Sequence, residues 1–242
     1  MLAAINGADA GDRGSIAAPF NFAAGAGISG LRLGYLPAAF ADAEATEVDR
    51  AALAAARSLG IPVIELALPD LPYHALMAIL YAEAAASFEQ LTLSNRDDEL
   101  VWQQKDAWPN AFRKARFLSA VDHVQADRLR YRVMQELDAL FGQVDVLIGP
   151  FMTGPMLVAS NFTGHPCLHL RGGFRAIGTR SDPSLASGRL EVGKETGTGR
   201  LFETPHGISL WAGLFDEGRL CNLGMALEAA LGVAERRPTF AR

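Results

Sequence analysis

The segment SNFTGHPCLHLRGG, residues 160–173, concentrates side chains that could do chemistry. Histidine and cysteine are preferred zinc ligands, and the same residue types serve as base and nucleophile in hydrolases. His165 and His169 are four residues apart, a spacing that can place two ligands on one face of a helix. Pro166 and the pattern that follows it instead place His169 in a strand. Because the chain has neither an H-E-x-x-H motif nor a paired C-x-x-C motif, the sequence predicts no metal site.

Two glycine-rich stretches match nucleotide-binding motifs, but their context is wrong. Residues 25–30, GAGISG, fit G-x-G-x-x-G, yet they precede a predicted strand, so no helix N-terminus would face a pyrophosphate. Residues 188–194, GRLEVGK, match a phosphate-binding loop until Glu195 takes the position of the serine or threonine that binds magnesium. A carboxylate at that position would repel phosphate. We interpret both as chance matches and expect no cofactor.

The residues needed for hydrolytic catalysis are scarce. Each of the three lysines, Lys105, Lys114 and Lys194, lies beside a charged residue, whereas a lysine that acts as a base needs burial to lower its pKa. No two serines are adjacent, and the G-x-S-x-G motif of many serine hydrolases does not occur. The sequence therefore offers no residue that we can assign as catalytic.

The composition is that of a globular chain with an acidic balance. Half of the 242 residues are apolar, and the formal net charge of -5 gives no basic surface for nucleic acid. No stretch reaches about 18 uninterrupted apolar residues, and the first residues lack the basic start of a signal peptide, so we expect neither a membrane span nor secretion. Cys167 and Cys221 lie in apolar runs, as expected of buried thiols in the reducing cytoplasm.

Hydrophobic periodicity predicts an α/β fold. A strand, a helix and a strand at residues 31–36, 44–60 and 61–69 have the spacing of a βαβ unit. Further strands are predicted at 144–150, 167–173 and 206–214. Further helices are predicted at 71–93, 110–141 and 216–232. The chain has no internal repeat and no clean linker, which favours a single unit.

Two regions differ in character from these elements. Residues 110–141 carry the longest helical pattern, with an apolar stripe mostly at three- and four-residue steps. The stripe consists of Leu118, Val121, Leu129, Val133, Leu137 and Leu140. Residues 175–203 are polar, rich in glycine and serine and without a clear period, which predicts a long loop.

Three stretches, taken in order, resemble the C-terminal half of an amidase signature hydrolase. Residues 116–152 contain an arginine-rich helix that leads into the strand DVLIGP, and residues 160–174 contain an Asn-x-Thr-Gly-x-Pro turn. Residues 203–240 contain a P-x-G-x-x-L strand and a helix with a glutamate. The start, LAAINGADAGDRGS, is similar to the segment that follows the signature region in that family. No single motif is specific, but their order and spacing are.

This resemblance implies a mixed β-sheet flanked by helices, incomplete in this chain, and hydrolysis of amide C–N bonds in the intact family. Family members use a Ser–Ser–Lys triad, with backbone N–H groups of a Gly-rich loop as the oxyanion hole. These groups lie in the N-terminal half of the family, and no residue here matches them. We therefore expect residues 1–242 to form the C-terminal portion of an amidase-like domain that is inactive alone.

The resemblance also indicates candidate substrate contacts. In the family, residues just before and within the Asn-x-Thr-Gly-x-Pro turn line the acyl side of the pocket, which makes Met156, Asn161 and Phe162 candidates. The alternative is a structural role, in which Asn161 and Thr163 bond local backbone in the turn and Gly164 relaxes it.

The expected partners follow from the same resemblance. A small amide substrate would bind only if the missing half were supplied, and apolar surface should be exposed where that half would bind. The alternative is a non-catalytic interaction protein, a remnant that pairs with a complementing N-terminal chain or with a second copy of itself.

Overall fold

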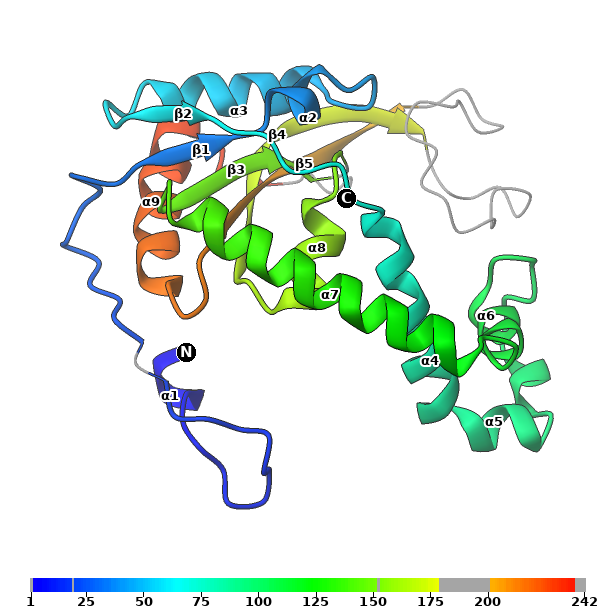
Figure 1. Cartoon of the computed structure of the whole chain (residues 1–242). Coiled ribbons are helices and arrows are strands. Elements are labelled where there is room, and N and C mark those ends of the chain that lie inside the picture. The colour runs from blue at the N-terminus through cyan, green and yellow to red at the C-terminus, as the bar shows by residue number, and fades with distance from the viewer. Residues whose placement is uncertain (1, 19, 152, 179–200, 238–242) are drawn as a thin grey trace. The chain divides into compact units, whose positions relative to one another are not determined.

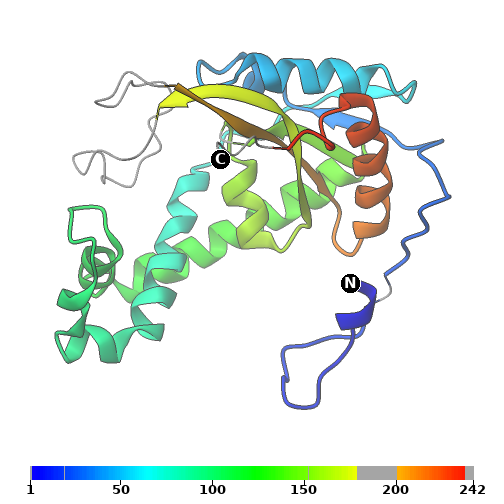
Figure 2. The same ribbon diagram turned by 180° about the vertical axis from the view of Figure 1, so that it is seen from behind.

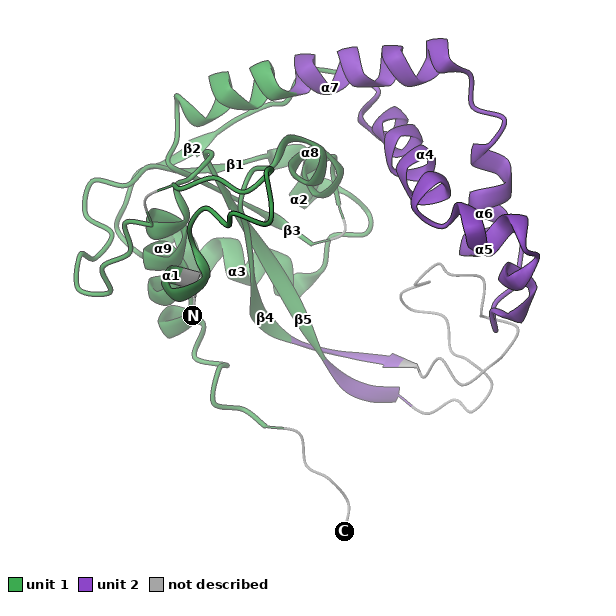
Figure 3. Ribbon diagram, turned by 90° about the horizontal axis from the view of Figure 1, so that it is seen from below, with its two compact units in different colours: residues 1–70, 134–173, 205–242 green, residues 71–133, 174–204 purple. Residues whose placement is uncertain are grey.

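The computed structural model describes residues 2–18, 20–151, 153–178 and 201–237. Contacts between Cα atoms divide the chain into two compact units (Figure 3). Unit 1 comprises residues 1–70, 134–173 and 205–242, and unit 2 comprises residues 71–133 and 174–204. In the described part of the chain, no helix is both long and apolar enough to cross a membrane.

A five-stranded mixed sheet runs through unit 1, and two of its strands extend into unit 2 (Figure 1). Its strands are β1 (Leu33–Tyr35), β2 (Val63–Glu65), β3 (Val146–Pro150), β4 (Cys167–Gly178) and β5 (Leu201–Ala212). The strand order is β2-β1-β3-β5-β4, with β1 parallel to both β2 and β3 and with β5 antiparallel to β3. This confirms the predicted mixed sheet flanked by helices.

Within unit 1 helices cover the sheet, and the described part of unit 2 is mostly helical (Figures 1 and 2). The α-helices are α1 (Leu2–Ile5), α2 (Pro37–Ala41), α3 (Glu47–Arg57), α4 (Met77–Ser87), α5 (Glu89–Leu93), α6 (Trp108–Ala115), α7 (Ala120–Phe141), α8 (Met156–Thr163) and α9 (Glu217–Leu231). Two short 3-10 helices, η1 (Tyr73–Leu76) and η2 (Arg96–Glu99), lie in unit 2.

One face of the sheet packs against α3 and α9. The buried cluster on this face joins alternate strand residues to apolar residues of the two helices, because successive side chains of a strand point to opposite faces. Its strand members are Leu33, Tyr35, Val146, Ile148, Ile208, Leu210 and Ala212. Its helix members include Ala52, Leu53 and Ala56 of α3 and Leu220, Leu223 and Leu227 of α9. This cluster is the core of unit 1.

The opposite face of the sheet meets α8. Leu147, between two residues of the first cluster, points to this face and is fully buried. Trp211 of β5 lies on the same face, and its indole Nε1 donates a hydrogen bond to Ser160 Oγ of α8 at 3.1 Å. A Cβ atom at Gly149 would lie 3.0 Å from the Trp211 ring, so the glycine lets the indole pack closely over β3. The sheet is therefore covered on both faces.

The N-terminal segment packs against the last helix within unit 1. A Cβ atom at Gly218, in the first turn of α9, would lie 2.3 Å from the carbonyl oxygen of Asn21. Only glycine allows the backbone of residues 21–22 to come this close to the helix. This contact ties two segments that are almost 200 residues apart in the sequence.

Unit 2 is built from short helices joined by aromatic contacts. Phe88 and Phe112 stack with ring centroids 5.1 Å apart, and the ring of Trp108 meets Tyr81 edge to face at 6.4 Å. Arg113 of α6 forms an ion pair with the buried carboxylate of Asp97, with Nη2 and Oδ2 2.7 Å apart. These contacts connect α4, α6 and η2.

Three predicted elements differ in the structure. The helix predicted at 71–93 is divided into η1, α4 and α5. The helix predicted at 110–141 ends at Ala115 and begins again at Ala120, because Ser119 caps α7 by accepting a hydrogen bond from Asp122 N at 3.0 Å. Of the predicted loop at 175–203, residues 175–178 belong to β4 and residues 201–203 belong to β5, and the rest lies outside the described residues. The GRLEVGK motif at 188–194 lies outside the described residues.

Candidate functional site

The predicted substrate-contact residues lie on α8, which follows β3. We expected a turn at Asn161–Pro166, and this expectation is wrong for residues 161–163, which are the end of helix α8, whereas the chain does turn at Gly164. The side chains that were expected to hold a turn instead bond backward along the helix, Asn161 Nδ2 donating to Leu157 O at 2.7 Å and Thr163 Oγ1 to Ala159 O at 2.8 Å. Gly164, with a φ of 80°, ends the helix in the left-handed conformation.

The three candidate residues do not share one surface of α8. Met156 is only 2% exposed, Asn161 is exposed, and Phe162 is half-buried. Offsets of five and six residues turn the helix by about 140° and 240° from Met156, so the three side chains leave α8 in different directions. The local-bonding role expected for Asn161 is present, and its contact with a substrate stays a prediction.

A buried histidine, His165, follows the end of α8. His165 is stacked on Phe141, with ring centroids 5.2 Å apart, and its Nδ1 lies 2.8 Å from Thr163 Oγ1. Burial lowers the pKa of His165 below 6.5, although the charge of Asp138 opposes the shift. The imidazole is therefore neutral at pH 7 and satisfied by its neighbour, which is the behaviour of a structural histidine.

Cys167, His169 and Ser209 have the connectivity of a nucleophile, a base and a group that orients the base. Cys167 Sγ lies 3.5 Å from His169 Nε2, and Ser209 Oγ lies 2.9 Å from His169 Nδ1. We expected buried thiols, and this expectation is wrong, because Cys167 is exposed and Cys221 is only half-buried. Partial burial still raises the pKa of the Cys167 thiol to about 11 and lowers the pKa of His169. The thiolate–imidazolium pair of a reactive cysteine is therefore disfavoured at pH 7. This group is a hydrogen-bonded link between β4 and β5.

A second buried polar cluster lies at the start of α3, and the sequence analysis missed it. Asp49 is 1% exposed, its carboxylate accepts hydrogen bonds from Thr46 N and Thr46 Oγ1 at 2.7 Å, and His206 Nε2 lies 3.1 Å away. Burial raises the pKa of Asp49, but the hydrogen bonds from His206 and Thr46 outweigh burial and hold it below 3.8. The T-E-V-D spacing of a capping box could have revealed the local part of this cluster.

None of these clusters has the composition of a metal centre. Among the described residues, no group of three or more histidine, cysteine, aspartate or glutamate side chains could hold a metal ion. Lys105 and Lys114 are both exposed, and Lys194 lies outside the described residues. The part of the chain that the structure describes thus presents no buried lysine of the kind that the amidase triad requires.

Neither a family model nor a curated protein matches this chain. Solved structures do match its fold. A bacterial aryl acylamidase that belongs to the amidase signature enzymes superposes with a TM-score of 0.64 at 14% identity, over 96% of this chain and 52% of the acylamidase. A 6-aminohexanoate cyclic dimer hydrolase, complexed with substrate, superposes with a TM-score of 0.61 at 19% identity, over 96% of this chain and 52% of the hydrolase.

A further match comes from a vestigial protein complex that reveals the evolutionary origins of an s-triazine catabolic enzyme. It has a TM-score of 0.63 at 22% identity and covers 95% of this chain and 50% of the matched chain. In each comparison nearly all of this chain is used, whereas half of the other protein has no counterpart. The chain therefore has the fold of the amidase signature enzymes over about half of their length.

Proposed function

We propose that this chain is the C-terminal, non-catalytic portion of an amidase-type hydrolase and acts only when a second portion supplies the Ser–Ser–Lys residues. The observation that carries the proposal is the coverage, which reaches 96% of this chain but only 52% of the aryl acylamidase. In this proposal residues 1–242 contribute strands of the sheet and part of the substrate pocket. Met156, Asn161 and Phe162 are the proposed contacts with a small amide substrate.

The chemistry of the described residues supports the inactivity of the chain alone. Hydrolysis by the family needs a serine nucleophile and a base that can take its proton. Lys105 and Lys114 are exposed, whereas the lysine of the family's triad is buried. Cys167 is the other nucleophile with a base nearby, and its high pKa keeps it protonated. Neither combination provides an activated nucleophile.

Exposed apolar side chains support the need for a partner. Phe117 is 90% exposed and Val121 is 68% exposed, and Val124 and Tyr131 lie on the same face of α7 as Val121 because they follow it by three and ten residues. Neighbouring apolar side chains at a surface commonly mark a binding site. That one similar structure is a vestigial protein complex is consistent with such pairing. We propose a complementing N-terminal chain as the partner.

The second candidate is a non-catalytic remnant that pairs with itself. The same exposed face of α7 favours this candidate, since a symmetric dimer would cover it in both copies. The two candidates differ in the mass of the assembly and in whether amide hydrolysis appears when a second chain is added.

We propose the cytoplasm as the compartment. Cys167 and Cys221 are free thiols, which a reducing environment preserves. Thiol titration of the protein taken directly from its cells would test this, because an oxidised pair would contradict it.

Coexpression provides the decisive test. The chain is produced alone and together with the polypeptide encoded immediately upstream of Met1, and hydrolysis of an aryl amide is measured with native mass spectrometry of each sample. We expect the chain alone to give no turnover above buffer, and the pair to form a one-to-one complex that hydrolyses the amide. Substituting the serine nucleophile of the upstream chain by alanine should abolish that activity. Turnover by the chain alone would refute the proposal, and a homodimer that ignores the upstream chain would favour the remnant.

A further inference from the structure

A pocket of about 420 Å³ lies in unit 2, between α4 and α6. Its volume falls within the range of about 300–1,000 Å³ that is typical of small-molecule sites. We call it the α4–α6 pocket. Its apolar lining consists of Ala78, Ala111, Ala115, Phe117 and Leu118, and its polar lining of Tyr81, Asp106 and Lys114. All of these residues belong to unit 2, away from α8 in the sequence and outside the clusters described above.

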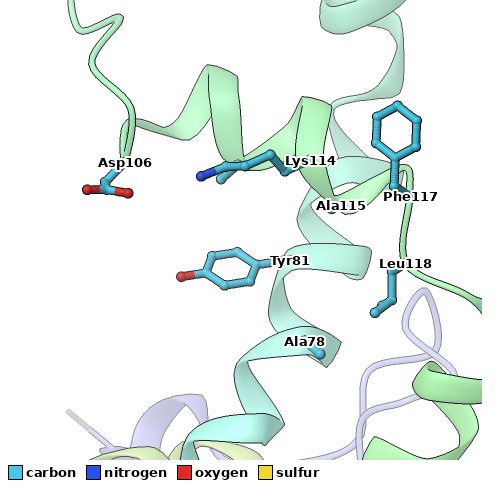
Figure 4. Close-up of a pocket in the computed structure, with 8 residues that line it drawn as sticks. Ala78, Tyr81, Asp106, Lys114, Ala115, Phe117 and Leu118 are labelled. Carbon is cyan, nitrogen blue, oxygen red and sulfur yellow. The ribbon is translucent and has the colours of Figure 1, made fainter.

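The polar groups gather at one end of the pocket. Figure 4 shows the Asp106 carboxylate, the Lys114 ammonium and the Tyr81 hydroxyl pointing to the same side, while Phe117 and Leu118 lie on the other. The pocket therefore has a polar end and an apolar end. An occupant with one polar head and one apolar body would match both.

The two charges at the polar end are available for a ligand. Lys114 Nζ donates one hydrogen bond, to Lys105 O at 3.1 Å, and an ammonium has three donors. Asp106 forms no ion pair within the described part of the chain, with Lys114 or with any other residue. An anionic group and a cationic group of a ligand could each find an opposite charge here.

The apolar end is formed by small and exposed residues. Ala78 of α4 and Ala111 and Ala115 of α6 leave the space that larger side chains would fill. Phe117 stands beside this space and is 90% exposed, so an apolar ligand body would cover part of its ring. Covering apolar surface favours binding by about 25 cal/mol for each Å² removed from water.

We propose that the α4–α6 pocket binds a free α-amino acid with an apolar side chain. Its carboxylate pairs with Lys114, its ammonium group pairs with Asp106, and its side chain lies on the alanines and Phe117. The lining carries one positive and one negative charge, so a simple carboxylate would meet repulsion from Asp106 and a simple amine repulsion from Lys114. A zwitterion satisfies both. Binding here does not require amide hydrolysis, but Phe117 belongs both to the pocket and to the apolar surface proposed for the partner chain.

Three probes that differ only in the head group test the charges. L-phenylalanine carries both charges, 3-phenylpropanoate lacks the ammonium group, and 2-phenylethylamine lacks the carboxylate. Titration of the full chain by NMR gives a dissociation constant for each probe. We expect L-phenylalanine to bind about threefold to fivefold more tightly than either analogue, because an exposed ion pair contributes at most about 1 kcal/mol.

Two substitutions assign each charge to its residue. Lys114→Met should weaken the binding of L-phenylalanine and of 3-phenylpropanoate. It should leave the binding of 2-phenylethylamine unchanged or make it tighter. Asp106→Asn should weaken the binding of L-phenylalanine and of 2-phenylethylamine. It should leave the binding of 3-phenylpropanoate unchanged or make it tighter. Both side chains are exposed, so thermal unfolding should be unaffected. Glu83→Gln removes an exposed charge outside the pocket and should change none of the constants.

The outcomes are decisive in both directions. Opposite selectivity of the two variants for the two analogues would establish the head-group assignment. No saturable binding of L-phenylalanine to the folded chain would overturn the proposal. Binding of 3-phenylpropanoate as tight as that of L-phenylalanine, with Asp106→Asn without effect, would also overturn it and identify a carboxylate site.

Discussion

The two units of this protein differ in where their polar and apolar groups lie. In unit 1 the strands and two helices share one buried cluster, and its buried polar groups Asp49, Ser160 and His165 all have hydrogen-bond partners within the unit. Large apolar side chains are exposed in both units, but in unit 2 the carboxylate of Asp106 also faces a pocket without an ion-pair partner among the described residues. Buried polar groups that are fully hydrogen-bonded help to specify a fold, whereas unpaired charges and exposed apolar side chains can bind a ligand or a partner. Unit 1 thus defines the architecture and unit 2 offers the binding surfaces.

The largest expected effect is a loss of stability on truncating the core of unit 1. Leu210→Ala removes a fully buried side chain of β5 and should lower the free energy of unfolding by about 2–5 kcal/mol. The control Leu214→Ala, at an exposed position two residues after β5, should change it by less than about 0.5 kcal/mol. Urea unfolding measures both. Equal effects would mean that the cluster on β5 does not hold unit 1 together.

The next effect tests the polar groups of unit 1. Asp49→Ala leaves Thr46 and His206 without their acceptor. It should lower the free energy of unfolding by about 1–3 kcal/mol at pH 7. Because folding lowers the pKa of Asp49 below 3.8, its contribution is present at neutral pH and is lost as the pH falls through the lowered value. The difference between the wild type and the variant should therefore shrink when urea unfolding is repeated near pH 3. A difference that stays constant with pH would show that the carboxylate is not stabilised by its partners.

A smaller effect is expected where the N-terminal segment meets α9. The Cβ atom of Gly218→Ala would collide with the carbonyl of Asn21, so the segment should move away from α9. The free energy of unfolding should fall by up to about 3 kcal/mol. Amide hydrogen exchange should become faster in residues 20–24. Gly25→Ala introduces a Cβ atom with nothing within 4 Å and should leave the exchange unchanged. Unchanged exchange in Gly218→Ala would remove this contact from the description of unit 1.

The smallest effect on stability should come from the exposed face of α7 in unit 2. Val121→Ser replaces a side chain that is 68% exposed and should alter the free energy of unfolding by less than about 0.5 kcal/mol. The same variant should weaken binding of the complementing chain in a sedimentation assay. Wild-type affinity in Val121→Ser would remove this face from the proposed interface and reduce the contrast between the units.

The sheet could be predicted because its strands carry a strong local signal. Residues 144–150 contain β3 and residues 31–36 contain β1, since both are short apolar runs between polar or glycine-rich segments. The break between α6 and α7 was not predicted, because helical periodicity continues on both sides of it and Ser119 can occupy a helix or cap one. Val121 belongs to the apolar stripe predicted for residues 110–141 and is exposed, since periodicity identifies a face but not what covers it.

The candidate site was less predictable than the fold. The contact of His206 with Asp49 joins residues 157 positions apart, and it forms because α3 packs against the sheet that contains β5. The helix at Met156–Thr163 was missed because Asn161, Thr163 and Gly164 favour turns as readily as helix ends. The α4–α6 pocket depends on the packing of two helices, which no local pattern specifies.

The position of β5 has a consequence for how the chain matures during translation. β5 is the last strand in the sequence, yet it lies between β3 and β4 in the sheet. Until residues 201–212 leave the ribosome, β3 has an unpaired edge, and open edges of this kind promote misassembly. The pairing of β3 with a strand more than 50 residues later also slows folding. We therefore expect the nascent protein to need chaperone protection until most of its sequence has been synthesised.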